Sequence, residues 1–155
     1  MGTPEYTVAE ALELFQRIGL DGAEIVVQDG YHCGIPQDAD PDELKRLRGL
    51  ADRLGLSIIA LTPYYSRFND LDPDIREGEI QGICKVIRYA EILGAKYIRI
   101  YAGNYGQMDA DPDGAKRTNL VQSMRRLGDK AEKAGVKLVM ENHFNTMTVS
   151  AADSI

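Results

Sequence analysis

Cysteine is scarce in this chain and tryptophan is missing. The 155 residues include two cysteines and no tryptophan. Cys33 and Cys84 are too few and too far apart for a disulfide framework or a zinc knuckle. Intracellular disulfides are rare, so we expect both residues to be reduced thiols in a cytoplasmic protein.

Long apolar runs and an excess of basic residues are also missing. No stretch approaches the ~20 apolar residues that cross a membrane, and residues 1–5 lack the basic and apolar regions of a signal peptide. The formal net charge is −6. An acidic surface repels nucleic-acid phosphates, so we expect neither a membrane nor a nucleic acid as partner.

Apolar residues are plentiful enough for a globular core. The hydrophobic fraction is 44% and the charged fraction is 27%, which is typical of a folded domain rather than a disordered chain. The length corresponds to one domain of ordinary size. We therefore expect a single domain over residues 1–155.

Four glycines mark a repeated unit. Gly19, Gly55, Gly94 and Gly135 each lie between a helix-like segment and an apolar run rich in β-branched residues, at intervals of 36, 39 and 41 residues. Glycine adopts the left-handed conformation that ends many helices. A period of this size indicates an array of one supersecondary unit.

The helix starts carry capping signals. Asp-Pro pairs at 40–41, 72–73 and 111–112 each place a capping carboxylate before a proline that suits the first helical position. The first helix is preceded by Thr7, and Glu10 completes a capping box. Gly78 and Gly82 predict a third helix that is weak near its start.

The strands predict a parallel sheet. Their nearly continuous apolar runs indicate burial on both faces, as in sheets covered by helices, and the alternation of helix and strand predicts an α/β fold. A doubly wound sheet would satisfy the same pattern. No glycine-rich phosphate loop follows the first strand, and the strand ends carry different polar residues, so a TIM barrel is favoured.

The predicted barrel is incomplete. A TIM barrel has eight strands and about 250 residues, whereas this sequence predicts about four strands. We therefore expect a partial barrel that lacks the first strand and the C-terminal strands. An arc of this kind has two open sheet edges, which predicts association with another copy of the chain.

Polar side chains gather at the predicted strand ends, which face the ligand site of a barrel. They are Gln28, Asp29 and His32; Thr62, Tyr64 and Tyr65; Tyr101 and Asn104; and Glu141, Asn142 and His143. His32 is a candidate ligand contact or a solvated loop residue. Tyr64, Tyr65, Tyr101 and Tyr105 could form an aromatic surface on which a sugar stacks. Alternatively, they only cover the ends of the strands.

The last strand ends in a candidate metal site. Glu141 and His143 are two residues apart and share one face of the strand. Carboxylate oxygen suits hard divalent cations, and imidazole suits the borderline metals. The alternative is that Glu141 is solvated and that Asn142, His143 or Asn145 caps a following helix.

Two charged residues interrupt the apolar strands. Glu24 and Arg99 lie in alternate strands, which contribute to one layer of a barrel interior. A buried carboxylate or guanidinium needs a partner. We therefore predict an interior ion pair between Glu24 and Arg99, with a structural role.

Three segments resemble the xylose-isomerase-like sugar phosphate isomerase/epimerase family. They are residues 11–15 leading to 19–25, residues 93–100 with Gly103, and residues 135–143. The resemblance implies one divalent metal, often manganese, magnesium, cobalt or zinc, held by a glutamate at the end of the fifth strand and by an aspartate, a histidine and a second glutamate from later strands. Glu141 matches the first glutamate, and the other three positions lie beyond Ile155.

The resemblance also implies an activity. Family members isomerise or epimerise small sugars or sugar acids by moving a proton next to the carbonyl through an enediolate, which implies that Glu141 is the catalytic base. From their places at the strand ends, we expect His32, Tyr64, Tyr101, Asn142 and His143 as substrate contacts. Without the later ligands, we expect the chain to be inactive by itself. One alternative is a non-catalytic partial barrel that associates through its edges. Another is an abasic-site nuclease of the endonuclease IV type, although two histidines and the net charge of −6 argue against it.

Overall fold

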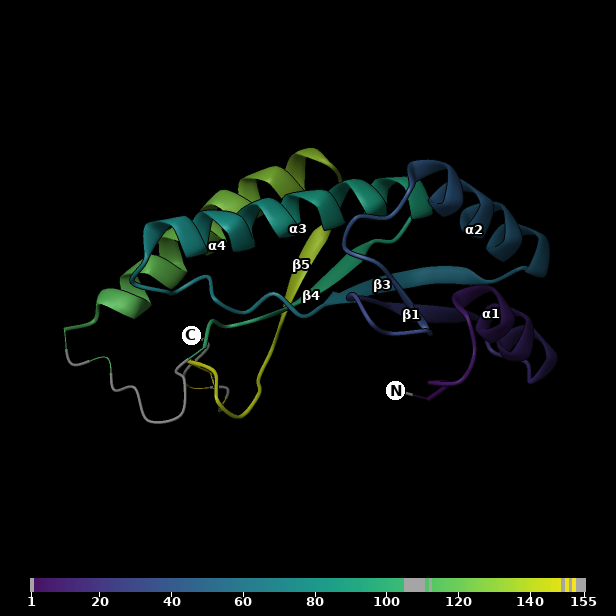
Figure 1. The fold of residues 1–155 in the computed structure, drawn as a ribbon, viewed down its shortest axis with the longest axis horizontal. Helices are drawn as coiled ribbons and strands as arrows, with labels where there is room; N and C mark the ends of the chain where they lie inside the picture. The colour runs from purple at the N-terminus through teal and green to yellow at the C-terminus, as the bar shows by residue number, and fades with distance from the viewer. Residues whose placement is uncertain (1, 105–110, 112, 149, 151, 153–155) are drawn as a thin grey trace.

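Helices and strands alternate along the chain in a computed structural model, which describes residues 2–104, 111, 113–148, 150 and 152 (Figure 1). Within this part of the chain, no helix is both long enough and apolar enough to cross a membrane. The elements in order are α1 (Val8–Arg17), β1 (Gly22–Val27), β2 (Gly34–Ile35), α2 (Pro41–Leu54), β3 (Ser57–Pro63), α3 (Pro73–Leu93), β4 (Tyr97–Tyr101), α4 (Ala115–Lys133) and β5 (Lys137–Glu141).

The predicted caps are confirmed in three of four helices. Thr7 and Glu10 form the capping box of α1, and the carboxylates of Asp40 and Asp72 accept the N–H groups that open α2 and α3. The predicted start of α4 is wrong, because that helix begins at Ala115. Asp111 still accepts hydrogen bonds from the backbone N–H groups of the first turn of α4, so it stabilises the helix end from a position before the cap.

The two glycines of α3 differ in their surroundings, and the predicted weakness of this helix near its start stays a prediction. This helix runs without interruption for 21 residues. Gly82 is buried beside the ring of Tyr65, and a Cβ built on Gly82 would lie 2.2 Å from Tyr65 Cζ. A Cβ at Gly78 would meet no atom within 4 Å. Gly82 is therefore required by packing, whereas Gly78 is not.

All five strands belong to one parallel sheet in the order β2-β1-β3-β4-β5. The four long strands are those predicted from the glycine repeat. The sequence analysis missed β2, because two residues are too few to show any periodicity. A register shift between Ala23 and Glu24 interrupts the pairing of β1 with β3.

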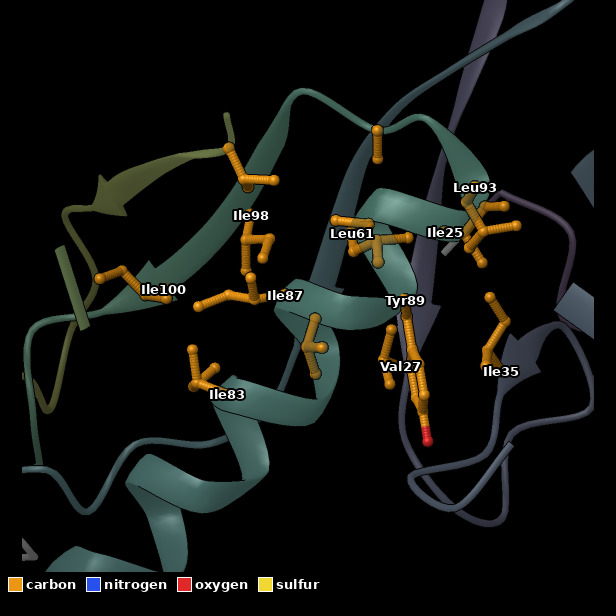
Figure 2. Close-up of a cluster of buried hydrophobic side chains, with 14 of the residues drawn as sticks. Ile25, Val27, Ile35, Leu61, Ile83, Ile87, Tyr89, Leu93, Ile98 and Ile100 are labelled. Atoms are coloured by element: carbon orange, nitrogen blue, oxygen red, sulfur yellow. The ribbon is translucent and has the colours of Figure 1, made fainter. Parts of the chain in front are cut away.

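The helices α2, α3 and α4 lie along one face of this sheet (Figure 1). Strand side chains such as Ile25, Leu61 and Ile98 point into that layer, where each is at most 4% exposed. Figure 2 shows them beside Ile87 and Leu93 of α3. Parallel strands with crossover helices on one face form the predicted arc of α/β units. Among the described residues, none of these three helices covers the opposite face of the sheet, where Phe15 of α1 reaches one side.

Candidate functional site

The uncovered face of the sheet, called the inner face below, forms an open hollow of about 440 Å³. Its lining includes side chains from all four long strands. They are Glu24 and Val26 of β1, Thr62 of β3, Tyr97 and Arg99 of β4, and Val139 and Glu141 of β5.

An ion pair between Arg99 and Glu141 lies on this face, near the carboxyl ends of β4 and β5. Arg99 Nε lies 3.1 Å from Glu141 Oε2, and the two side chains are 15% and 45% exposed. The Arg99 guanidinium lies over two rings, with its Cζ 4.1 Å from the centre of Tyr101 and 5.4 Å from that of Tyr64. Such contacts between cations and aromatic faces are attractive. The two rings therefore position Arg99, and Arg99 directs the Glu141 carboxylate.

The predicted ion pair between Glu24 and Arg99 is not formed within this chain. Glu24 is exposed and lies level with Ala60 and Tyr97 in the strand register. Arg99 is two strands away, at roughly twice the 4.8 Å spacing of neighbouring strands. Glu141 is on the adjacent strand β5, so Arg99 pairs with Glu141 instead.

A row of rings crosses the carboxyl ends of the strands. The aromatic row consists of Tyr31, Tyr64, Tyr101, His143 and Phe144. Its successive ring centres are separated by 5.8, 6.4, 5.1 and 4.1 Å. Burial raises the pKa of Tyr101, although the charge of Arg99 opposes this shift. Four of the five rings, all but Tyr31, also line or border a second hollow of about 380 Å³ at the mouth of the sheet.

Several predicted site residues meet in this row, and others do not. Tyr64, Tyr101 and His143 are in contact, while Asn142 is exposed beside them. His32 is exposed near α1, where it contributes to the lowered pKa of Glu10 after the larger effect of hydrogen bonds from Thr7. Tyr65 packs against α3 rather than at the mouth, which raises its pKa by burial. Tyr105 lies outside the described residues.

Two members of the aromatic row were missed from the sequence. Tyr31 stacks on Tyr64 with an angle of 8° between the ring planes. Phe144 is 71% exposed, the most exposed of the large apolar side chains in the described part of the chain. Each follows a strand end within a few residues, so an aromatic residue just beyond a strand was the available signal.

The loops that carry the row are tied together by Asn69. This side chain is 1% exposed. Its Nδ2 donates to the Asn104 carbonyl at 2.8 Å and approaches Met147 Sδ at 3.2 Å, and its Oδ1 accepts the Asn104 N–H at 2.9 Å. Gly103 has a φ of +67°, and a Cβ there would lie 2.7 Å from Asn69 Cγ. Asn69 thus joins the loops that follow β3, β4 and β5, and it requires glycine at 103.

The described residues do not form a complete metal site. Over residues 2–104, 111 and 113–148, together with 150 and 152, no three side chains of His, Cys, Asp or Glu come together. Glu141 is the carboxylate at the predicted position, and its oxygen is engaged by Arg99. The donor set therefore does not fit a divalent cation by itself.

Comparisons with known proteins place this geometry in a family. The model of the family described as xylose isomerase-like TIM barrel matches residues 12–155. No curated protein matches the chain in sequence.

Solved structures share the fold at low sequence identity. A D-tagatose 3-epimerase-like protein aligns at 18% identity with a TM-score of 0.80, over 96% of this chain and 55% of its own. A D-psicose 3-epimerase crystallised in the presence of D-fructose aligns at 15% with a TM-score of 0.74, over 93% and 50%. A xylose isomerase-like TIM barrel protein from Mycobacterium smegmatis in complex with magnesium aligns at 18% with a TM-score of 0.71, over 94% and 50%.

The chain spans about half the length of these structures. Its parallel sheet and outer helices are an arc of the barrel that they share, so the predicted incomplete TIM barrel is confirmed. The inner face is then the barrel interior, and the aromatic row lies at the mouth where barrel enzymes bind ligands. The chain belongs to the xylose isomerase-like TIM-barrel family.

Proposed function

We propose that this chain provides the sugar-binding rim and the proton-transferring carboxylate of a sugar isomerase or epimerase. The observation that carries the proposal is the aromatic row beside Glu141, whose carboxylate is directed by Arg99. The sugar epimerases among the structural neighbours support the reaction class.

The aromatic row suits a small sugar. A sugar presents C–H groups on its ring faces and hydroxyl groups around them, so an aromatic side chain with a polar tip can contact both. Tyr64 and Tyr101 have such tips, and His143 adds a ring nitrogen. Phe144 offers an exposed apolar face next to them. Sugar binding at this rim is consistent with a site of a few hundred cubic ångströms.

Glu141 is the candidate base. Isomerases and epimerases of sugars remove the proton from the carbon next to the carbonyl, which leaves an enediolate, and then return a proton. One carboxylate can perform both transfers of an isomerisation if it lies within hydrogen-bond reach of that carbon's proton, whereas an epimerisation needs a second proton donor on the opposite face of the enediolate. The ion pair with Arg99 restricts the directions in which Glu141 can point, which is the pre-organisation that such a transfer needs.

A divalent cation stays a prediction for this chain. The resemblance implies manganese, magnesium, cobalt or zinc, and a structural neighbour was crystallised with magnesium. Because the described residues do not complete a cation site, we expect this chain alone to bind a sugar weakly and not to interconvert it.

The test separates binding from proton transfer. Ketoses such as D-fructose are titrated into the ¹⁵N-labelled chain, and amide shifts are followed by NMR. We expect shifts confined to the loops after β3, β4 and β5. Incubation in D₂O then reports any deuterium taken up next to the carbonyl. No binding of any simple ketose or aldose would refute the proposal.

Matched variants locate the site. Phe144→Ser removes an exposed ring from the rim and should weaken sugar binding about two- to tenfold, the range of one aromatic contact. Ile18→Ser removes an exposed side chain of 62% exposure at the C-terminal end of α1, against 71% for Phe144, and should leave binding unchanged. Equal effects of the two changes would place the site away from the aromatic row. If deuterium uptake is detected, Glu141→Gln should abolish it.

A further inference from the structure

Glu79 of α3 holds the loop that follows β3. Its Oε2 accepts the N–H of Ser66 at 2.7 Å and the N–H of Arg67 at 2.9 Å. Hydrogen bonds to a carboxylate are roughly twice as strong as those between neutral groups. The backbone directly after Tyr64 and Tyr65 is therefore fixed with respect to α3.

The same helix also receives the ring of Tyr65. Gly82 lies three residues after Glu79, so the two residues are neighbours on one face of α3. A Cβ on Gly82 would lie 2.2 Å from Tyr65 Cζ, because the ring packs directly against the helix backbone. The loop is thus attached to α3 at two points, by the Glu79 carboxylate and by the Tyr65 ring. Tyr64 lies between these attachments and the end of β3.

The ring of Tyr64 joins two parts of the aromatic row. It stacks on Tyr31 with 5.8 Å between the ring centres and 8° between the ring planes. Its centre is 6.4 Å from that of Tyr101, and Arg99 Cζ lies 5.4 Å from it. The energy of a stacked ring pair depends on the offset between the two rings. The backbone position at Tyr64 therefore decides whether this stack forms.

The loop that carries Tyr31 is held by the same helix. Tyr89 Oη donates to the Gln37 carbonyl at 2.9 Å and accepts the Ala39 N–H at 3.0 Å. Asp29 Oδ1 accepts the Gln37 N–H at 2.8 Å, which ties this part of the loop to the chain just before Tyr31. Both rings of the stack thus lie in loops that α3 holds.

We propose that Glu79 is a positioning residue for the sugar-binding rim, because it holds the Tyr64 ring in its stack on Tyr31. Glu79 lines neither of the two hollows described above, so it acts through the loop and not by contact with the sugar. A stack that is formed before the sugar arrives leaves less conformational entropy to be lost on binding. This inference rests on the proposed function, since it concerns the same site.

The first measurement needs no sugar. Nuclear Overhauser cross-peaks between the ring protons of Tyr31 and Tyr64 report their stack, and those between Tyr101 and His143 report the neighbouring contact. We expect Glu79→Ala to remove the first set and to keep the second, while circular dichroism shows that the chain stays folded. Glu79→Gln keeps an oxygen that can accept both N–H groups and should preserve both sets. Glu79→Asp shortens the side chain by one methylene group, so it should weaken the first set, and it replaces the alanine variant if that variant does not fold.

The second measurement is the affinity for D-fructose, titrated by NMR. Glu79→Ala should weaken binding about two- to tenfold, the range of one aromatic contact, and Glu79→Gln should retain most of the affinity. Glu77→Ala is the matched control, because Glu77 is half-buried on the same helix and pairs with Arg126 of α4 instead of a loop after a strand. It should leave both the ring cross-peaks and the affinity unchanged.

The two measurements can fail separately. If the natural chain binds no simple ketose or aldose, the proposed function is refuted, while the ring cross-peaks still decide whether Glu79 positions Tyr64. Cross-peaks between Tyr31 and Tyr64 that survive Glu79→Ala would overturn the positioning role. An equal loss of the cross-peaks between Tyr101 and His143 would also overturn it, because Glu79 would then support the whole fold and not this stack.

Discussion

Two glycines in one helix should respond in opposite ways to alanine. Gly78 and Gly82 both lie inside α3, where alanine is favoured over glycine by about 0.5–1 kcal/mol because glycine loses more backbone entropy. At Gly78 nothing opposes this gain, since a Cβ would meet no atom within 4 Å. Gly78→Ala should therefore raise the free energy of unfolding by about 0.5–1 kcal/mol and Tm by roughly 1–4 °C for a chain of this size.

At Gly82 the packing cost outweighs the helical gain. A Cβ there would lie 2.2 Å from Cζ and 2.3 Å from Cε1 of Tyr65. The ring of Tyr65 must move out of its half-buried position, and overpacking of this kind costs about 1–3 kcal/mol. After the helical gain, Gly82→Ala should destabilise the chain by about 0–2.5 kcal/mol.

The assay is urea and thermal unfolding followed by far-ultraviolet circular dichroism at pH 7. A double-mutant cycle isolates the cause. In a Tyr65→Ala background the obstructing ring is gone, so adding Gly82→Ala should become stabilising by about as much as Gly78→Ala. If Gly82→Ala stabilises the natural chain as much as Gly78→Ala does, the packing argument for Gly82 is refuted.

Three further predictions concern the rim and the helix ends. Asn69→Ala removes two backbone hydrogen bonds from a buried amide and should cost about 2 kcal/mol of stability, with broadened sugar-site resonances in NMR. Asp72→Ala should cost about 1 kcal/mol through the lost cap of α3, whereas Asp74→Ala should cost less in the same urea titration. The pKa of Glu10 is lowered from 4.5 by hydrogen bonds from Thr7. Ionised Glu10 therefore stabilises the folded chain above pH 4.5, and this stabilisation is lost as the pH falls through the lowered pKa. Glu10→Gln should lower Tm at pH 7 but not at pH 2.

The architecture followed from local signals. The glycine repeat predicted four helix ends, and Gly19, Gly55, Gly94 and Gly135 all adopt positive φ. The capping residues located three helix starts within the usual uncertainty. The exception was α4, where the Asp-Pro signal lies ahead of the helix and Asp111 reaches it through a turn. Signals that act over three or four residues were thus sufficient for the order of the helices and the four long strands and for the partial barrel, but not for β2.

The same local signals predicted only part of the candidate site. Strand ends predicted that Tyr64, Tyr101 and His143 would lie near one another, and they do. The partner of Arg99 was not predicted, because the choice between Glu24 and Glu141 depends on strand order and on a register shift in β1. The number of residues between Glu24 and Arg99 does not reveal that register shift.

The sequence by itself determined the local structure of this protein, because a left-handed glycine, a capping carboxylate and an apolar run each act on the residues beside them. Only the tertiary structure decided which side chains meet. The spacing and register of the strands turned Arg99 toward Glu141, and loop packing around Asn69 set the ring of His143 beside Tyr101. These contacts join residues distant in sequence and depend on how whole elements pack.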